Sequence, residues 1–225
     1  MQKLLLLHGA LGSAENFKEL REMLADYEIH SLNFGGHGGN AIPEQLAIPV
    51  FGQEVLDYLD QNQIKKIHIF GYSMGGYVGL YIARNFPERV EKLMTLATKL
   101  QWTIDGAANN ASLLNPEIIK QKVPKYAALL ENLHGKNWEV LLHKTAEMMH
   151  QLGAHPTLGT EDFPAITIPV LIAVGDNDMM VGIEESVNAY RLLSNGQFLV
   201  LPNTPHPIEK VNISELAHQL RNYFN

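Results

Sequence analysis

One segment joins a strand-like run to a helix-like run through a glycine-rich turn. Residues 67–70 have the length and apolar character of a buried strand, and they are followed by Gly71-Tyr72-Ser73-Met74-Gly75. A helical pattern begins directly behind them. Glycine on both sides of a serine suits a tight turn in which neighbouring backbones approach closely. The order predicts a nucleophile elbow, with Ser73 presented at the start of a helix. A glycine-rich turn with a capping serine is the structural alternative.

Short apolar runs alternate with amphipathic stretches along most of the chain. This alternation predicts an α/β fold with a doubly wound, mostly parallel sheet and helices on both faces. We expect strands at residues 3–7, 28–32, 66–70, 90–97, 170–174 and 198–201, and helices at 14–27, from 49 onward, at 74–86, 184–193 and 208–224.

The alternation is interrupted over residues 99–164, which contain no clear strand. Helical spacing is present there around 117–133 and 138–152. A helical insertion between two strands of such a sheet would cover the ligand crevice at the strand ends. We therefore expect a core of residues 1–98 and 165–225 with a cap or lid at 99–164. A helical unit that only packs against the core is the alternative.

Composition narrows the range of partners. A chain of 225 residues can form one domain with a sizeable core. The formal net charge of -7, without a basic block, argues against a nucleic-acid partner. The absence of cysteine excludes disulfides and thiolate metal sites, and a cytoplasmic protein is the simpler expectation. The leucine run that ends at Leu7 is short for a signal peptide, and no run is long enough to cross a membrane.

Two loops that follow predicted strands carry the groups that a serine nucleophile needs. A serine hydroxyl becomes nucleophilic when a base takes its proton, and a carboxylate orients that base. Asp176 and Asp178 follow one predicted strand, and His206 follows the last one. The order serine, aspartate, histidine along the chain is that of the nucleophile-elbow class. The residues alone leave the choice between the two aspartates open.

Together these segments resemble the α/β-hydrolase fold superfamily over nearly the whole chain, with residues 99–164 as its variable cap. The resemblance implies an acid at the end of a Gly-x-x-Asp segment, which selects Asp178 over Asp176. The chain departs from the family pattern at His206, which follows Pro205 where relatives usually have glycine. Relatives also carry two further strands before the first strand of this chain. We therefore expect a shortened sheet with an edge to be blunted or buried in a partner, and a monomer or possible homodimer.

The loop after the first strand resembles the family's His-Gly oxyanion loop. An oxyanion hole needs N–H donors that are fixed before charge develops on the substrate. The resemblance assigns these donors to the backbone N–H groups of Ala10 and Met74, while His8 holds the loop together. We expect Leu11 and Trp102 to line the substrate pocket, with ordinary core packing as the alternative for Trp102.

Ten histidines raise the question of a metal site. His143 and His150 could share a helix face, with His155 and Asp162 close in sequence. No zinc motif accompanies them, so no metal is expected. The elbow also lacks the glycine pattern and the lysine of nucleotide-binding loops, and no cofactor is expected.

The prediction for function is a serine hydrolase with Ser73, His206 and Asp178 as a catalytic triad. Its expected substrate is a small or medium carboxylic ester, cleaved through an acyl-enzyme as in a carboxylesterase. A ligand-binding receptor with vestigial turnover is one alternative.

Cleavage of a carbon–carbon bond on the same triad is the other alternative, because a fold does not fix a reaction. Such enzymes often hold a carboxylated substrate with a basic group. Lys99, Lys144 and Arg191 are candidates that the sequence cannot place.

Overall fold

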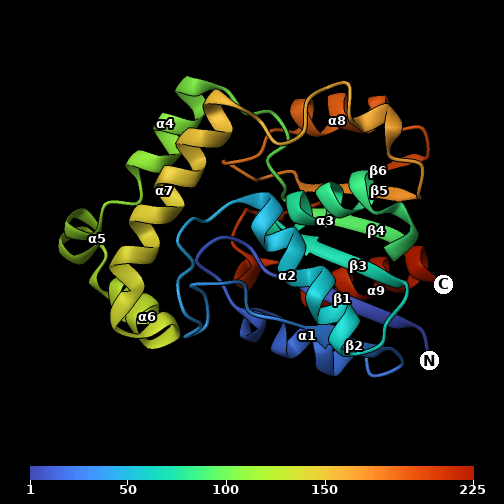
Figure 1. The fold of residues 1–225 in the computed structure, drawn as a ribbon, viewed down its shortest axis with the longest axis horizontal. Helices are drawn as coiled ribbons and strands as arrows, with labels where there is room; N and C mark the ends of the chain where they lie inside the picture. The colour runs from blue at the N-terminus through green and yellow to red at the C-terminus, as the bar shows by residue number, and fades with distance from the viewer.

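A computed structural model describes residues 1–225 and places six strands in one parallel sheet (Figure 1). The strand order is β2-β1-β3-β4-β5-β6, and all neighbouring strands are parallel. The strands are β1 (Lys3–Leu7), β2 (Glu28–Ser31), β3 (Ile67–Tyr72), β4 (Val90–Leu96), β5 (Val170–Gly175) and β6 (Gly196–Leu201).

The strand order reverses between β1 and β3. From β1 the chain passes to β2 on one side, and it then returns to β3 on the other side. Ligands of open parallel sheets bind outside the carboxyl ends of the strands at such a reversal. The loops after β1 and β3 both begin at this point, so they are brought together by topology.

Helices cover both faces of the sheet, which confirms the doubly wound architecture. One face packs against α2 (Ile48–Gln61), α3 (Met74–Asn85) and α8 (Ile183–Leu192), and the other packs against α1 (Lys18–Met23) and α9 (Ile213–Phe224). The side chains of Leu4 to Leu7 are completely buried, and every residue of β5 is buried. Continuous apolar strands are the consequence of a parallel sheet with two covered faces.

Four helices form the insertion between β4 and β5. They are α4 (Ile104–Ser112), α5 (Pro116–Lys122), α6 (Pro124–His134) and α7 (Trp138–Ala154), and they stand at the carboxyl end of the sheet (Figure 1). The prediction of one continuous helix around 117–133 is wrong. It is broken between α5 and α6 at Pro124, because a proline inside a helix lacks the N–H donor and its ring clashes with the preceding turn.

Two other helix boundaries differ from the sequence expectation. The segment expected to be helical at 208–224 begins with a short 3-10 turn, Ile208–Lys210, and α9 starts only after Asn212 caps the Glu215 N–H. The helix α4 was not expected; the Thr103 hydroxyl caps its first turn by accepting from the Gly106 N–H. None of the helices combines the length and the apolar character needed to span a lipid bilayer.

Candidate active site

Ser73 lies on a strained turn between β3 and α3. Its backbone has φ of 51° and ψ of -118°, a conformation that residues with a side chain rarely adopt. A Cβ on Gly75 would overlap the carbonyl oxygen of Leu7, so only glycine fits beside the serine. The Thr98 hydroxyl, just after β4, donates a hydrogen bond of 3.0 Å to the Ser73 carbonyl. The turn is therefore fixed by its neighbours on both sides.

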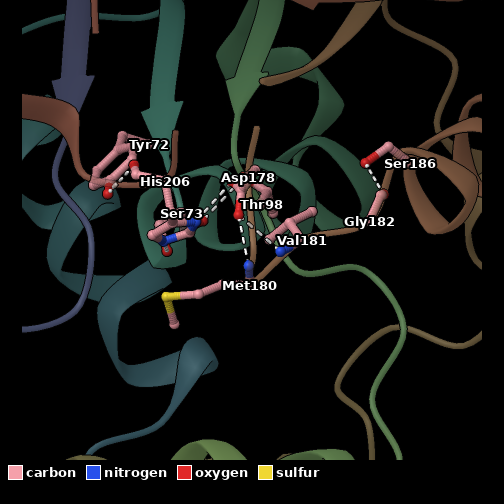
Figure 2. Close-up of polar contacts among 9 residues, drawn as sticks. All are labelled: Tyr72, Ser73, Thr98, Asp178, Met180, Val181, Gly182, Ser186 and His206. Atoms are coloured by element: carbon pink, nitrogen blue, oxygen red, sulfur yellow. Dashed lines mark hydrogen bonds and ion pairs between the residues drawn. The ribbon is translucent and has the colours of Figure 1, made fainter. Parts of the chain in front are cut away.

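Ser73, His206 and Asp178 form a hydrogen-bonded series (Figure 2). The Ser73 Oγ lies 3.5 Å from His206 Nε2, and His206 Nδ1 lies 2.8 Å from Asp178 Oδ2. The Asp178 side chain is completely buried and that of His206 is 13% exposed. Because the carboxylate accepts the Nδ1 proton, Nε2 presents its lone pair to the serine hydroxyl.

The two candidate aspartates have different surroundings. The second oxygen of Asp178, Oδ1, accepts the N–H groups of Met180 at 2.8 Å and Val181 at 2.9 Å (Figure 2). Asp176 points elsewhere: its Oδ1 accepts the Thr204 N–H at 3.0 Å. Hydrogen bonds from the backbone of Asn203 and of Thr204 lower the pKa of Asp176. Asp178 therefore orients His206, and Asp176 fixes the loop that leads to it.

The backbone N–H groups of Ala10 and Met74 lie beside the serine. Ala10 and Met74 line the same pocket as Ser73, and neither N–H donates to a backbone carbonyl. A Cβ on Gly9 would lie 3.1 Å from the Cβ of Ser73, so the loop after β1 approaches the elbow closely. Both residues belong to the adjoining ends of β1 and β3, and their N–H groups have no backbone acceptor. The assignment of these two N–H groups to an oxyanion hole stays a prediction.

An apolar pocket opens in front of Ser73. It has a volume of about 60 Å³, and ten of its fourteen lining residues are hydrophobic. Trp102 lines it, together with Tyr77, Met148 and Leu152, and Lys99 is one of its few polar residues. Leu11 lies outside this lining. Its side chain belongs to the hydrophobic core, where it is 9% exposed. Its backbone has a φ of 59°.

Sequence reasoning missed several residues that shape the site. Thr98 holds the elbow, the N–H groups of Met180 and Val181 hold Asp178, and the Tyr72 hydroxyl contacts the main chain of His206. Tyr72 could have been singled out, because it directly precedes the serine. The other contacts join segments far apart in the chain.

His8 and His37 are buried behind the site and do not face its pocket. His8 Nδ1 donates to the Gly9 carbonyl at 2.8 Å, and Nε2 accepts the Phe34 N–H at 3.1 Å. Burial lowers the pKa of His8 from 6.5 to about 4 and that of His37 well below 6.5, so both rings are neutral near pH 7. No group of three or more histidine, aspartate or glutamate side chains is placed to hold a metal ion.

Comparison with known proteins identifies relatives by sequence and by fold. A family model described as the alpha/beta hydrolase fold matches residues 3–136. Esterase YbfF of Escherichia coli is 30% identical over 41% of this chain and 37% of its own length. The dihydrolipoyllysine-residue acetyltransferase component of the acetoin cleaving system of Pseudomonas putida is 33% identical over 96% of this chain and 62% of its own length. The chain thus spans less than two thirds of either relative.

A protein of known structure has a fold similar to that of this chain. The 2-hydroxy-6-oxo-6-phenylhexa-2,4-dienoate hydrolase of Rhodococcus sp. strain RHA1 superposes with a TM-score of 0.82 at 18% identity. The match covers 99% of this chain and 90% of that one. The likeness in fold therefore extends over nearly the whole chain, the helical insertion included.

Proposed function

Because the chain belongs to the alpha/beta hydrolase fold family, we propose that it is a serine hydrolase that cleaves a small or medium carboxylic ester. The observation that carries the proposal is the series from Ser73 through His206 to Asp178, with separations of 3.5 Å and 2.8 Å, at the floor of an apolar pocket. The esterase among the relatives supports this reaction class. A cytoplasmic location, and a monomer or homodimer, stay part of the proposal as expected from the sequence.

The proposed reaction begins with proton transfer from Ser73 to His206. As Nε2 takes the hydroxyl proton, Oγ attacks the ester carbonyl and its oxygen becomes an oxyanion. The N–H groups of Ala10 and Met74 stabilise that charge. The imidazolium, stabilised by Asp178, then gives its proton to the departing alcohol, which leaves an acyl group on the serine.

Water completes the cycle by the same route. His206 takes a proton from a water molecule, and the hydroxide oxygen attacks the acyl carbonyl. The second tetrahedral intermediate collapses, the carboxylic acid leaves, and Ser73 regains its proton. The apolar lining suits an uncharged acyl or alcohol group, since an apolar surface there is removed from water when the substrate binds.

Hydrolysis of p-nitrophenyl esters from acetate to laurate tests this proposal. Turnover should depend on acyl length, and Ser73→Ala should lower kcat by at least about 10³-fold while the protein stays folded. Ester turnover that survives in Ser73→Ala would overturn the assignment. A folded wild type that hydrolyses none of the esters would also count against it.

The position of Lys99 favours one second candidate, carbon–carbon cleavage of a carboxylated substrate. Lys99 lines the pocket, and its ammonium lies 3.4 Å from the Glu185 carboxylate. Two further N–H donors of the ammonium are available to a substrate anion. An anionic 1,3-diketone would be the probe. Lys99→Met should raise the KM for this diketone. Glu185→Gln, the matched control, should lower the KM. Equal effects of the two variants would exclude carbon–carbon cleavage.

A further inference from the structure

Three buried histidines meet where the helical insertion touches the core. His8 follows β1, His37 follows β2, and His134 is the last residue of α6. The ring centroids of His8 and His37 are 5.0 Å apart, and those of His37 and His134 are 5.7 Å apart. His134 is 5% exposed, although it belongs to the insertion. None of the three lines the pocket, and each forms hydrogen bonds with the backbone of a loop.

His134 bridges two loops of the core with its two ring nitrogens. Nδ1 accepts the Gly38 N–H at 3.0 Å, and Nε2 lies 2.9 Å from the Leu11 carbonyl oxygen. An N–H partner at Nδ1 requires a lone pair there, so the proton of the neutral ring is on Nε2 and is donated to Leu11. These contacts span 96 and 123 residues of sequence. The end of α6 is thus tied directly to the loop after β1.

The carbonyl that His134 holds belongs to the turn that carries the Ala10 N–H. The Gly12 N–H donates to the Gly9 carbonyl at 3.1 Å, which closes a turn with Ala10 and Leu11 at its centre. Leu11 has a φ of 59°, a conformation that costs free energy for any residue other than glycine. Such a conformation persists only where surrounding contacts impose it. The hydrogen bond from His134 is one such contact.

We propose that His134 is a positioning residue that fixes the Ala10 N–H through the Leu11 carbonyl, so that the oxyanion hole is complete only while α6 is seated on the core. This inference rests on the proposed function, because it assigns the Ala10 N–H to the oxyanion. It gives the helical insertion a part in transition-state stabilisation in addition to covering the pocket. His134 itself touches no substrate.

Two nearly isosteric substitutions separate the two hydrogen bonds. In His134→Gln the side-chain amide can donate to the Leu11 carbonyl but offers no acceptor at the Nδ1 position. In His134→Asn the shorter side chain can accept from the Gly38 N–H but cannot reach Leu11. Replacing His143, an exposed histidine on α7, by Gln and by Asn provides the matched control. Kinetics are measured on the full chain, at a temperature where each variant has the far-UV circular dichroism of the wild type.

The proposal predicts different kcat values for the two variants. His134→Asn should lower kcat for a p-nitrophenyl ester about tenfold with KM within about twofold, because the lost interaction acts in the transition state. His134→Gln should stay within about threefold of the wild type in kcat. Inhibition by an alkyl trifluoromethyl ketone, which forms a tetrahedral oxyanion on the serine, should weaken in His134→Asn in parallel with kcat.

Several results would overturn the proposal. Equal losses in the two His134 variants, or a change confined to KM, would mean that the residue only packs α6 against the core. Unchanged ketone inhibition in His134→Asn would exclude a role in the oxyanion hole. A His134→Asn variant that folds at no temperature would show that the bond holds the whole fold.

Hydrogen exchange tests the anchoring step without any activity. Amides of residues 8–14 should exchange faster in His134→Asn than in His134→Gln or the wild type. Equal exchange would overturn the proposal. Ester turnover that survives in Ser73→Ala would instead overturn the proposed function, and the exchange measurement would still decide whether His134 anchors the turn.

Discussion

The Tyr72 hydroxyl donates a hydrogen bond of 2.9 Å to the main-chain carbonyl of His206 (Figure 2). The two rings also lie close, with centroids 5.7 Å apart. Burial raises the pKa of Tyr72, so the hydroxyl keeps its proton and remains a donor at any ordinary pH. Because Tyr72 directly precedes Ser73, this bond ties the elbow to the loop that carries His206, the proposed base. The pair of loops is thereby held in one arrangement.

Replacing Tyr72 by Phe should reduce turnover moderately. A hydrogen bond of this kind contributes about 0.5–1.5 kcal/mol. If its loss misplaces His206, kcat should fall by between about twofold and tenfold, with little change in KM. Tyr81→Phe is the matched control, because Tyr81 packs against Gly52 on α2, away from this loop. Equal kcat values for the two variants would contradict the role given to the bond.

The two aspartates should respond very differently to amide substitution. In Asp178→Asn an amide N–H would face the Nδ1–H of His206, so the ring would be driven toward the wrong tautomer, and kcat should fall by about 10⁴-fold. In Asp176→Asn the side chain keeps a carbonyl oxygen for the Thr204 N–H. That variant should stay within about threefold of the wild type. Ester hydrolysis at saturating substrate measures both, and the reverse order of effects would exchange the two roles.

Two buried threonines near the elbow allow a paired test of stability. Thr98 donates to the Ser73 carbonyl, whereas the Thr95 hydroxyl, also buried, has no hydrogen-bond partner. Thr98→Val removes this bond, while the carbonyl still accepts the N–H groups of Gly76 at 3.0 Å and Tyr77 at 3.3 Å. The variant should therefore lower the free energy of unfolding by about 0.5–1.5 kcal/mol. Thr95→Val removes an unsatisfied hydroxyl and should be neutral or stabilising. Urea unfolding of both variants checks this, and similar losses would refute the distinction.

The elements that the sequence predicted well are those set by local pattern. The strand, the turn and the helix around Ser73 lie next to one another in the chain, so apolar periodicity and glycine spacing are enough to locate them. The six strands were predicted for the same reason. Asp178 was a harder case, because Asp176 is only two residues away and both follow the same strand. The family resemblance favours Asp178. In the structure Asp178 lies 2.8 Å from His206 Nδ1, whereas Asp176 accepts the Thr204 N–H.

Other features depend on contacts between distant segments and left no signal in the sequence. The hydroxyl of Thr98 and the ring of His134 act on carbonyls 25 and 123 residues away. The positive φ of Leu11 follows from the packing of its turn, and the sequence pattern gave no reason to place its side chain in the core. The break at Pro124 is different, since a local rule was available and helical spacing on both sides outweighed it.

Trp102 should control which acyl chains fit the pocket. Its ring lies 6.3 Å from that of Tyr77 in an edge-on arrangement, and both residues line the cavity beside the serine. Trp102→Ala enlarges this space, so the optimum in a p-nitrophenyl ester series should move to longer chains. The other tryptophan, Trp138, does not line the pocket, and Trp138→Phe should leave the optimum unchanged. An unchanged optimum in Trp102→Ala would place the acyl group elsewhere.

The buried histidines should make the protein less stable as the medium becomes acidic. Burial lowers the pKa of His8 to about 4 and that of His37 well below 6.5, whereas both groups titrate near 6.5 once the chain unfolds. Between these values the unfolded state binds more protons, so the free energy of unfolding falls as pH falls. From pH 7.5 to 5.5 the His8 ring should contribute a loss of about 1.3 kcal/mol. His37, His68 and His134, whose pKa values burial also lowers, should add losses of the same sign.

Carboxylates change the free energy of unfolding in both directions as pH falls. Asp26, Glu28 and Asp176 have lowered pKa values, so their contributions are lost only at more acidic pH. Burial raises the pKa of Glu54 and Glu185, and these groups act in the opposite direction as pH falls toward 4.5. Urea unfolding at pH 7.5, 6.5 and 5.5 measures the net effect of the histidines and of these two carboxyl groups, and we expect the histidines to dominate it. A free energy of unfolding that stays constant or rises as pH falls over this range would contradict the net loss expected from the buried rings.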